Sequence, residues 1–144
     1  MRIIVQRVSQ ATVSVTDQIV GAIGPGYFVL VGFSETDTVA EVDKMAEKLL
    51  NLRVMADENE KMNLSITDVV GEILLVSQFT LYANTSQRRP SFIHAAKPEV
   101  AAPLFDYFVT QVRASGLKVE TGEFGSYMTI NSTADGPVTI ILES

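Results

Sequence analysis

The sequence predicts an α+β fold, in which a mainly antiparallel or mixed β-sheet curls into a small barrel-like domain with two helices. Strand-like segments gather at both ends of the chain, two segments with helical periodicity lie between them, and no Gly-, Ser-, Pro- or charge-rich tract is long enough to be a linker. Strands and helices do not alternate one by one, so a doubly wound fold is not expected. We therefore expect a single domain over residues 1–144.

The first third of the chain is strand-like. Apolar residues alternate over residues 3–7 and again over 11–15, and the latter segment is expected to form a hairpin with a strand at 18–23. Residues 24–26, Gly-Pro-Gly, are a strong turn signal. Residues 27–33 that follow are almost entirely apolar, which predicts a strand buried on both faces at the centre of the sheet.

Helical periodicity then takes over. We expect a helix from Thr38 to Asn51, opened by a capping box between Thr38 and Glu41. A short strand at 53–55 and a polar loop at 56–63 follow it. Residues 72–79 are rich in Ile, Leu and Val and predict a second apolar strand.

A second helix is expected to open with Pro98 as its first residue and to stop at Gly116. Pro103 lies about one turn inside, so the helix is expected either to start late or to bend there. Three further strands, separated by turns at 122–125 and 133–137, are predicted at 117–121, 127–130 and 138–142.

Composition excludes several classes of protein. With 47% apolar and 19% charged residues, the chain can bury a core, so intrinsic disorder is not expected. No apolar run approaches the roughly 20 residues of a membrane-spanning helix, and the first residues show no secretion signal. The absence of cysteine excludes disulfides, thiolate nucleophiles and zinc–thiolate sites. We expect a cytoplasmic protein with no membrane partner.

The net charge of -6 argues against a broad basic face for nucleic acid, because neutralisation of phosphates supplies most non-specific affinity. We expect no DNA partner, and an RNA partner would have to be gripped locally. The clustered cations are Arg88-Arg89 and, further on, Lys97. On charge pattern alone, the arginine pair is typical of a solvated loop.

Several standard catalytic patterns are missing. His94 is the only histidine, so a Ser-His-Asp triad would have to combine it with Ser77 or Ser91, and no Gly-x-Ser-x-Gly motif is present. A surface position is the ordinary one for such a histidine. No metal-ligand spacing and no nucleotide-binding glycine motif occurs, so neither a metal nor a cofactor is expected.

Two segments stand out. Ser77-Gln78-Phe79-Thr80-Leu81 places three hydrogen-bonding side chains at the end of an apolar strand, where buried polar groups need partners. Ser77 and Thr80 would find such partners in neighbouring backbone if the segment were purely structural. Gly136-Pro137 immediately precedes a strand, and an X-Pro bond tolerates the cis form, although the plain turn is the commoner outcome.

Together, Ser77-Gln78-Phe79-Thr80-Leu81 and Gly136-Pro137-Val138-Thr139 resemble the two signature motifs of the D-aminoacyl-tRNA deacylases. The likeness extends to residues 1–8, to Arg89-Pro90-Ser91-Phe92, and to Gly122-Glu123-Phe124-Gly125 followed by Met128. It therefore spans essentially the whole chain.

The resemblance implies an enzyme that hydrolyses the ester bond of D-aminoacyl-tRNA, with aminoacylated tRNA as its partner. It also implies a homodimer with two active sites at the interface, each completed by Gly136-cis-Pro137 of the other subunit. Carbonyl oxygens of that segment would leave no room for an L side chain, which is steric rejection. Glycine, which has no side chain, should enter the same pocket.

The resemblance further assigns roles to residues. Backbone N–H groups around Phe79 and Thr80 would stabilise the negative carbonyl oxygen, while water and the 2′-hydroxyl of the tRNA carry out the attack. Thr80 is expected to position the substrate, with a nucleophilic role as the lesser option. Ser77 and Gln78 complete the catalytic segment, with Gln78 orienting the ester or ribose. The expected substrate-binding residues are Gly136, Pro137, Met128, Phe92, Phe124 and Arg7. Phe92 and Phe124 would face the adenine, and Arg7 would brace the Gly-Pro segment.

Two departures from the family pattern occur. Ala134 stands where the family usually has Asn, and Ser86-Gln87-Arg88 stands where Lys-Gly-Asn is common. The second departure affects how the acceptor stem is held, with Arg88 supplying the charge of the lysine.

Two other functions remain open at the level of sequence. One is a hydrolase of small molecules or peptides that uses Thr80 or Ser77 as a nucleophile. The other is a non-catalytic barrel that binds RNA ends or a protein partner.

Overall fold

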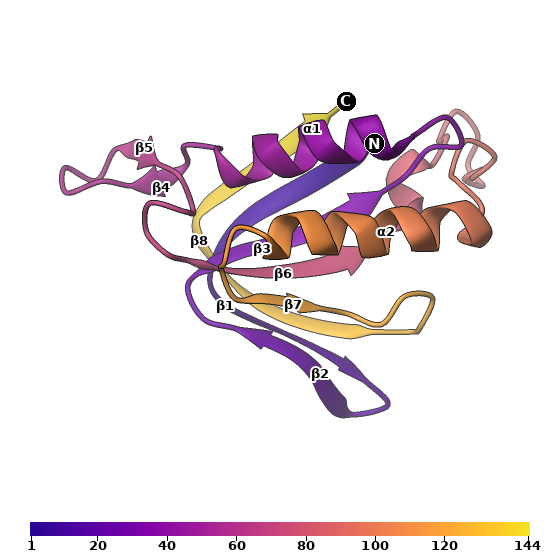
Figure 1. Cartoon of the computed structure of the whole chain (residues 1–144). Helices are drawn as coiled ribbons and strands as arrows, with labels where there is room; N and C mark the ends of the chain where they lie inside the picture. Colours follow the sequence, from indigo (N-terminus) through magenta and orange to yellow (C-terminus); the bar gives the residue numbers. More distant parts are fainter.

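The computed structural model describes residues 1–144 and contains one large sheet, one small hairpin and two helices (Figure 1). The large sheet consists of β1 (Arg2–Val15), β2 (Gln18–Ile23), β3 (Gly26–Gly32), β6 (Glu72–Ser77), β7 (Val119–Thr121) and β8 (Thr129–Glu143). The remaining elements are α1 (Val39–Leu50), β4 (Met55–Ala56), β5 (Met62–Leu64), the 3-10 helix η1 (Phe79–Tyr82) and α2 (Pro98–Arg113).

The sheet is mixed, as predicted, and β3 lies at its centre. The strand order is β2-β1-β3-β6-β7, with β8 paired along the other edge of β1. β1 is antiparallel to β2, β3 and β8, whereas β3, β6 and β7 are parallel. The sheet curls until β2 meets β7, and a Cβ on Gly21 would stand only 2.9 Å from the Thr121 carbonyl oxygen. This approach gives the domain its barrel-like form.

Both helices cover one face of the sheet (Figure 1). Their apolar stripes meet the inward residues of β1, β3 and β6 in a core of 24 buried residues, in which Tyr27 and Phe108 are fully buried. A smaller core of six residues fills the inside of the curl and takes Leu74 and Val76 from the opposite face of β6. β6 is therefore buried on both faces, while the second face of β3 carries the half-buried Phe28 and Leu30. Neither helix is long and apolar enough to span a membrane.

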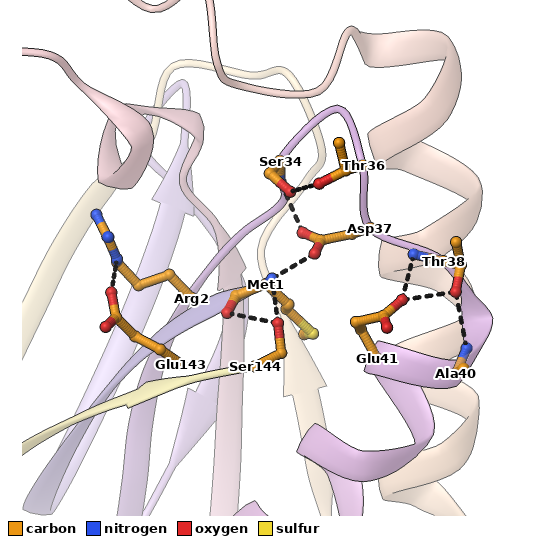
Figure 2. A network of polar contacts seen from close by, with 10 residues as sticks. All are labelled: Met1, Arg2, Ser34, Thr36, Asp37, Thr38, Ala40, Glu41, Glu143 and Ser144. Atoms are coloured by element: carbon orange, nitrogen blue, oxygen red, sulfur yellow. Dashed lines mark hydrogen bonds and ion pairs between the residues drawn. The ribbon is translucent and has the colours of Figure 1, made fainter.

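The start of α1 is held by a polar network (Figure 2). The Thr38 hydroxyl accepts from the Ala40 N–H, and the Glu41 carboxylate accepts from the Thr38 N–H at 2.8 Å, which confirms the predicted capping box. Asp37 accepts from the Met1 ammonium at 2.5 Å and from the Ser34 N–H at 2.7 Å. The network joins the first strand to the turn that precedes α1.

Several predicted boundaries were wrong. The segments at 3–7 and 11–15 form one long strand, β1, because β8 pairs with nearly its whole length. The predicted turn at 133–137 is likewise part of the continuous β8, where the register with β1 shifts. The predicted strand at 72–79 ends at Ser77, and Phe79 opens η1.

Smaller differences affect the rest of the chain. The short strand falls at Met55–Ala56 instead of 53–55, and its hairpin partner β5 begins inside the predicted polar loop of 56–63 and ends one residue beyond it. α2 begins at Pro98 and continues through Pro103 to Arg113, so it does not start late. Gly116, with φ of +80°, follows it as the expected stop.

Candidate active site

A largely apolar cavity of about 580 Å³ opens where the parallel strands β3 and β6 end. Val31 and Val76 of these strands line it, together with the connection after β6, the first turn of α2 and the connection between β7 and β8. These segments lie together on the right in Figure 1. Its volume is that of a pocket for a small organic ligand.

The polar segment predicted from the sequence stands at the edge of this cavity. Ser77, Gln78 and Phe79 line it, and the Gln78 N–H donates to the Val31 carbonyl at 2.7 Å, so the segment stays attached to β3 after β6 has ended. The Gln78 side-chain amide donates to the Thr80 hydroxyl at 2.6 Å. Thr80 is exposed and is not among the lining residues, but this bond ties it to one of them.

Aromatic and thioether side chains form much of the remaining surface. Phe92 meets Phe79 edge to face, with ring centroids 5.1 Å apart. Phe124 packs on Phe105 of α2 at 6.1 Å, which holds the β7–β8 connection against the helix. Met128 lies over Gly122, where a Cβ would be 2.6 Å from the Met128 sulfur. The structure thus brings Phe92, Phe124 and Met128 to one cavity.

The other three predicted site residues lie elsewhere. Arg7 pairs with Tyr27 at the beginning of β3, whereas the cavity lies beyond Val31 at its end, about 13 Å further along the strand. Gly136 and Pro137 lie beside Arg7 on β8 and are exposed, and the peptide bond between them is cis. Within one chain, the Gly-Pro segment does not reach the cavity.

Arg7 holds the strand around this segment. Its Nε lies 2.9 Å from the Asp135 carboxylate, as an ion pair without hydrogen-bond alignment, and its Nη1 donates to the Val54 carbonyl at 2.8 Å. Gly136 has φ of +121°, which favours glycine, and a Cβ there would stand 2.8 Å from a Val138 methyl group. Position 136 therefore excludes larger residues.

The cavity offers hydrogen-bond donors but no histidine or carboxylate that could act as a general base. None of its 18 lining residues is a histidine, aspartate or glutamate, and Lys97 is the only charged one. His94 lies in a separate, open polar depression with Arg2 and Tyr82, so no triad with Ser77 is assembled. The arrangement can bind an apolar group and direct N–H and amide donors toward a polar one.

The sequence did not identify all of the lining residues. Phe33, Ala95 and Ala96 join the cavity only because residue 34 bridges residue 95, which depends on tertiary pairing. Tyr127 was expected in a strand, but β8 begins two residues later and leaves Tyr127 on the connection at the cavity rim.

The chain is thus a small single-domain α+β protein, with a curled mixed sheet under two helices and an apolar cavity at the ends of its parallel strands. The model of a family described as D-Tyr-tRNA(Tyr) deacylase matches residues 4–143. The chain belongs to this family, and it is a hydrolase that acts on an ester bond.

Individual relatives agree with this membership. A D-aminoacyl-tRNA deacylase of Roseiflexus sp. (strain RS-1) is 54% identical, with 100% of this chain and 94% of that protein covered. One of Clostridium perfringens is 51% identical, with 100% and 97% covered. The solved structure of a c-Myc DNA unwinding element binding protein superposes with a TM-score of 0.95 at 42% identity and covers 100% of this chain and 99% of that one. The family resemblance read from the sequence is confirmed.

Proposed function

We propose that this chain hydrolyses the ester bond of D-aminoacyl-tRNA in the cytoplasm and releases a free D-amino acid and tRNA. The observation that carries the proposal is the Ser77-Gln78-Phe79-Thr80 segment at the edge of an apolar cavity, in a chain of the deacylase family. The cavity would take the terminal adenosine and the aminoacyl group. Phe92 and Phe124 offer apolar surface for the adenine, and Met128 adds to it.

Donors for the developing oxyanion are available at the start of η1. Phe79 and Thr80 are the first two residues of this 3-10 helix, so their N–H groups have no hydrogen-bond acceptor within it. Neither N–H group donates to a backbone carbonyl in a turn, loop or helix cap. Acyl transfer to water is accelerated when such donors face the carbonyl oxygen as it becomes negative. Water, assisted by the neighbouring 2′-hydroxyl of the terminal ribose, would then attack the carbonyl carbon; the ester bond to the ribose oxygen breaks, and that oxygen takes up the proton that the water loses. Gln78 would orient the ester or ribose.

Thr80 is assigned to positioning. Its hydroxyl accepts a hydrogen bond from the Gln78 amide, and no side chain that could remove its proton is bonded to it. An unactivated hydroxyl is a weak nucleophile. The same argument disfavours Ser77, which has no base beside it in the cavity.

A second subunit is part of the proposal. Gly136 and Pro137 lie too far from the cavity of their own chain to touch its ligand, yet they are exposed and held in place through Arg7 and Asp135. In a homodimer with two-fold symmetry, the segment of one chain can enter the cavity of the other. Its carbonyl oxygens would exclude an L side chain, while glycine, like a D-amino acid, would fit.

Two other functions fit less well. A hydrolase with a covalent acyl intermediate needs an activated nucleophile, which the cavity does not offer. A barrel that only binds RNA would not explain why the N–H groups at the start of η1 are free to donate to a ligand. One relative is named for binding a DNA element, but the net charge of -6 gives this chain no broad basic surface for a duplex.

The test is deacylation of matched D-tyrosyl-tRNA and L-tyrosyl-tRNA by the purified chain and by the variants Thr80→Ala, Thr80→Ser and Pro137→Ala. We expect release from the D substrate alone, substantial activity in both Thr80 variants, and weakened discrimination against L-tyrosine in Pro137→Ala. Complete loss in Thr80→Ala with retention in Thr80→Ser would favour a nucleophile. Inertness of the unmodified chain toward both substrates would contradict the proposed hydrolysis.

A further inference from the structure

Tyr127 is an exposed aromatic side chain at the rim of the cavity. It is 93% exposed, the highest value among the large apolar residues, and it still lines the cavity. A single exposed aromatic residue is unremarkable on a protein surface. At the rim of a cavity, however, an exposed aromatic ring can contact a bound ligand.

The turn that carries Tyr127 is well anchored. Gly122 donates its N–H to the Leu75 carbonyl at 3.0 Å, and Phe124 packs on Phe105 of α2. The hydroxyl of Ser126 donates to the Glu123 carboxylate at 2.7 Å. The ring is therefore presented from a fixed support, which reduces the entropy lost when a ligand packs on it.

Lys97 supplies a charge at the same cavity. It is the only charged lining residue, it is exposed, and it makes no ion pair. The chain as a whole carries a net charge of -6, and Lys97 places one positive charge at this cavity. A lysine and an exposed aromatic ring that line the same cavity match the chemistry of single-stranded nucleic acid, which presents stackable bases and phosphates.

We propose that Tyr127 and Lys97 form a subsite for the nucleotide that precedes the terminal adenosine of the substrate. Tyr127 stacks on its base, and Lys97 contacts the phosphate that joins the two nucleotides. The inference rests on the proposed function. A cavity of about 580 Å³ has the size of a pocket for one small organic ligand, such as an aminoacylated nucleoside, so the next nucleotide is expected at the rim.

The subsite explains how an acidic chain holds RNA without a long basic track. Stacking on an aromatic ring tolerates any base, and one phosphate contact adds affinity that depends on salt. The grip on the 3′ end then comes from two residues at the cavity itself.

The experiment compares two minimal substrates, D-tyrosyl-adenosine and the D-tyrosyl ester of cytidylyl-adenosine, which differ by one nucleotide. For each variant, the readout is the ratio of kcat/KM for the longer substrate to that for the shorter one. We expect a ratio of roughly tenfold or more in the unmodified chain, because stacking of one base contributes at about this level. Tyr127→Ala should lower the ratio severalfold and leave only the part that Lys97 contributes, and the matched control Tyr127→Phe should keep the ratio of the unmodified chain.

Lys97→Gln should lower the ratio and make it less dependent on salt. In a plot of the logarithm of the ratio against the logarithm of the salt concentration, the slope should become shallower by roughly 0.7, the value for the loss of one phosphate contact. The molecular mass in solution is measured for each variant. A Tyr127→Ala chain that changes its oligomeric state would show that Tyr127 is a subunit contact and would overturn the inference.

The remaining outcomes separate the two proposals. If the unmodified chain hydrolyses both substrates with a ratio near one, the subsite does not exist, although the deacylase function stands. If Tyr127→Ala lowers kcat/KM for the two substrates by the same factor, the residue has a structural role and the subsite is again wrong. If neither D-tyrosyl substrate nor D-tyrosyl-tRNA is hydrolysed, the proposed function itself fails.

Discussion

Arg2 holds the 3-10 helix that carries the proposed donors. Its Nη1 donates to the Leu81 carbonyl at 2.5 Å, its Nε contacts Glu143 at 2.5 Å (Figure 2), and its guanidinium lies 5.1 Å from the Tyr82 ring centroid. Leu81 and Tyr82 end η1, so Arg2→Ala should loosen the turn in which Phe79 and Thr80 present their N–H groups. Because Arg2 is partly exposed, we expect a modest fall in kcat, about fivefold, with KM little changed.

Steady-state kinetics on D-tyrosyl-tRNA measure this effect. Arg2→Lys is the matched control, since it keeps the charge near Glu143 but loses the fork that reaches Leu81. Added guanidinium ion should restore part of the activity of Arg2→Ala. A variant with a lower melting temperature and an unaltered kcat would show that Arg2 has only a structural role.

Tyr27 makes the stability of the fold sensitive to alkaline pH. Burial raises the pKa of its phenol to about 12, with the nearby Arg7 acting in the opposite direction, and its hydroxyl donates to the Leu52 carbonyl. The folded chain thus holds this proton more tightly than the unfolded chain, whose tyrosine pKa is about 10. The resulting stability is present below pH 10 and is lost as the pH rises toward 12, by about 2 kcal/mol.

Urea unfolding of the unmodified chain and of Tyr27→Phe between pH 9 and pH 12 measures this loss. Lysines and the other tyrosines titrate in both proteins, so the difference between the two curves isolates Tyr27. The difference should shrink as the pH rises. Two curves that stay parallel throughout would show that Tyr27 does not control the alkaline transition.

At the scale of the element, the capping box of α1 is open to a direct test. The Thr38 hydroxyl accepts from the Ala40 N–H, and the N–H and hydroxyl of Thr38 both donate to Glu41. Thr38→Ala removes the side-chain part of this cap and should lower the free energy of unfolding by about 1 kcal/mol. Thr38→Ser keeps the hydroxyl and should unfold almost as the unmodified chain does in a urea titration.

The outcome for α1 shows which elements a sequence can predict. Thr38, Glu41 and the apolar stripe that follows are all local signals, and the predicted range of 38–51 is the helix plus its two cap residues. The ends of β1 and β8 are not local. Each strand continues through a polar stretch because the other supplies its hydrogen bonds, and that pairing joins residues more than a hundred positions apart.

The same distinction applies to the candidate site. The Ser77-Gln78-Phe79-Thr80 segment could be identified by its polar residues at an apolar strand end, and the structure places Ser77, Gln78 and Phe79 at the cavity, with Thr80 bonded to Gln78. The separation of Gly136-Pro137 from this cavity could not be predicted from residues alone, because it depends on the register of β8 against β1. No sequence pattern indicated that Tyr127 belongs to the site, because its place at the cavity rim depends on where β8 begins.

At the scale of the whole molecule, that separation yields a test of the shared active site. Gln78→Ala should disable the cavity side, and Gly136→Val should disable the other side, because position 136 has φ of +121°. Each homodimer should then be nearly inactive on D-tyrosyl-tRNA. In a heterodimer purified through two different tags, one site would carry both defects and the other neither, so about half of the unmodified activity should return. If each site were built within one chain, both sites of the heterodimer would carry a defect and no activity would reappear, which would refute the exchange of Gly136-Pro137 between subunits.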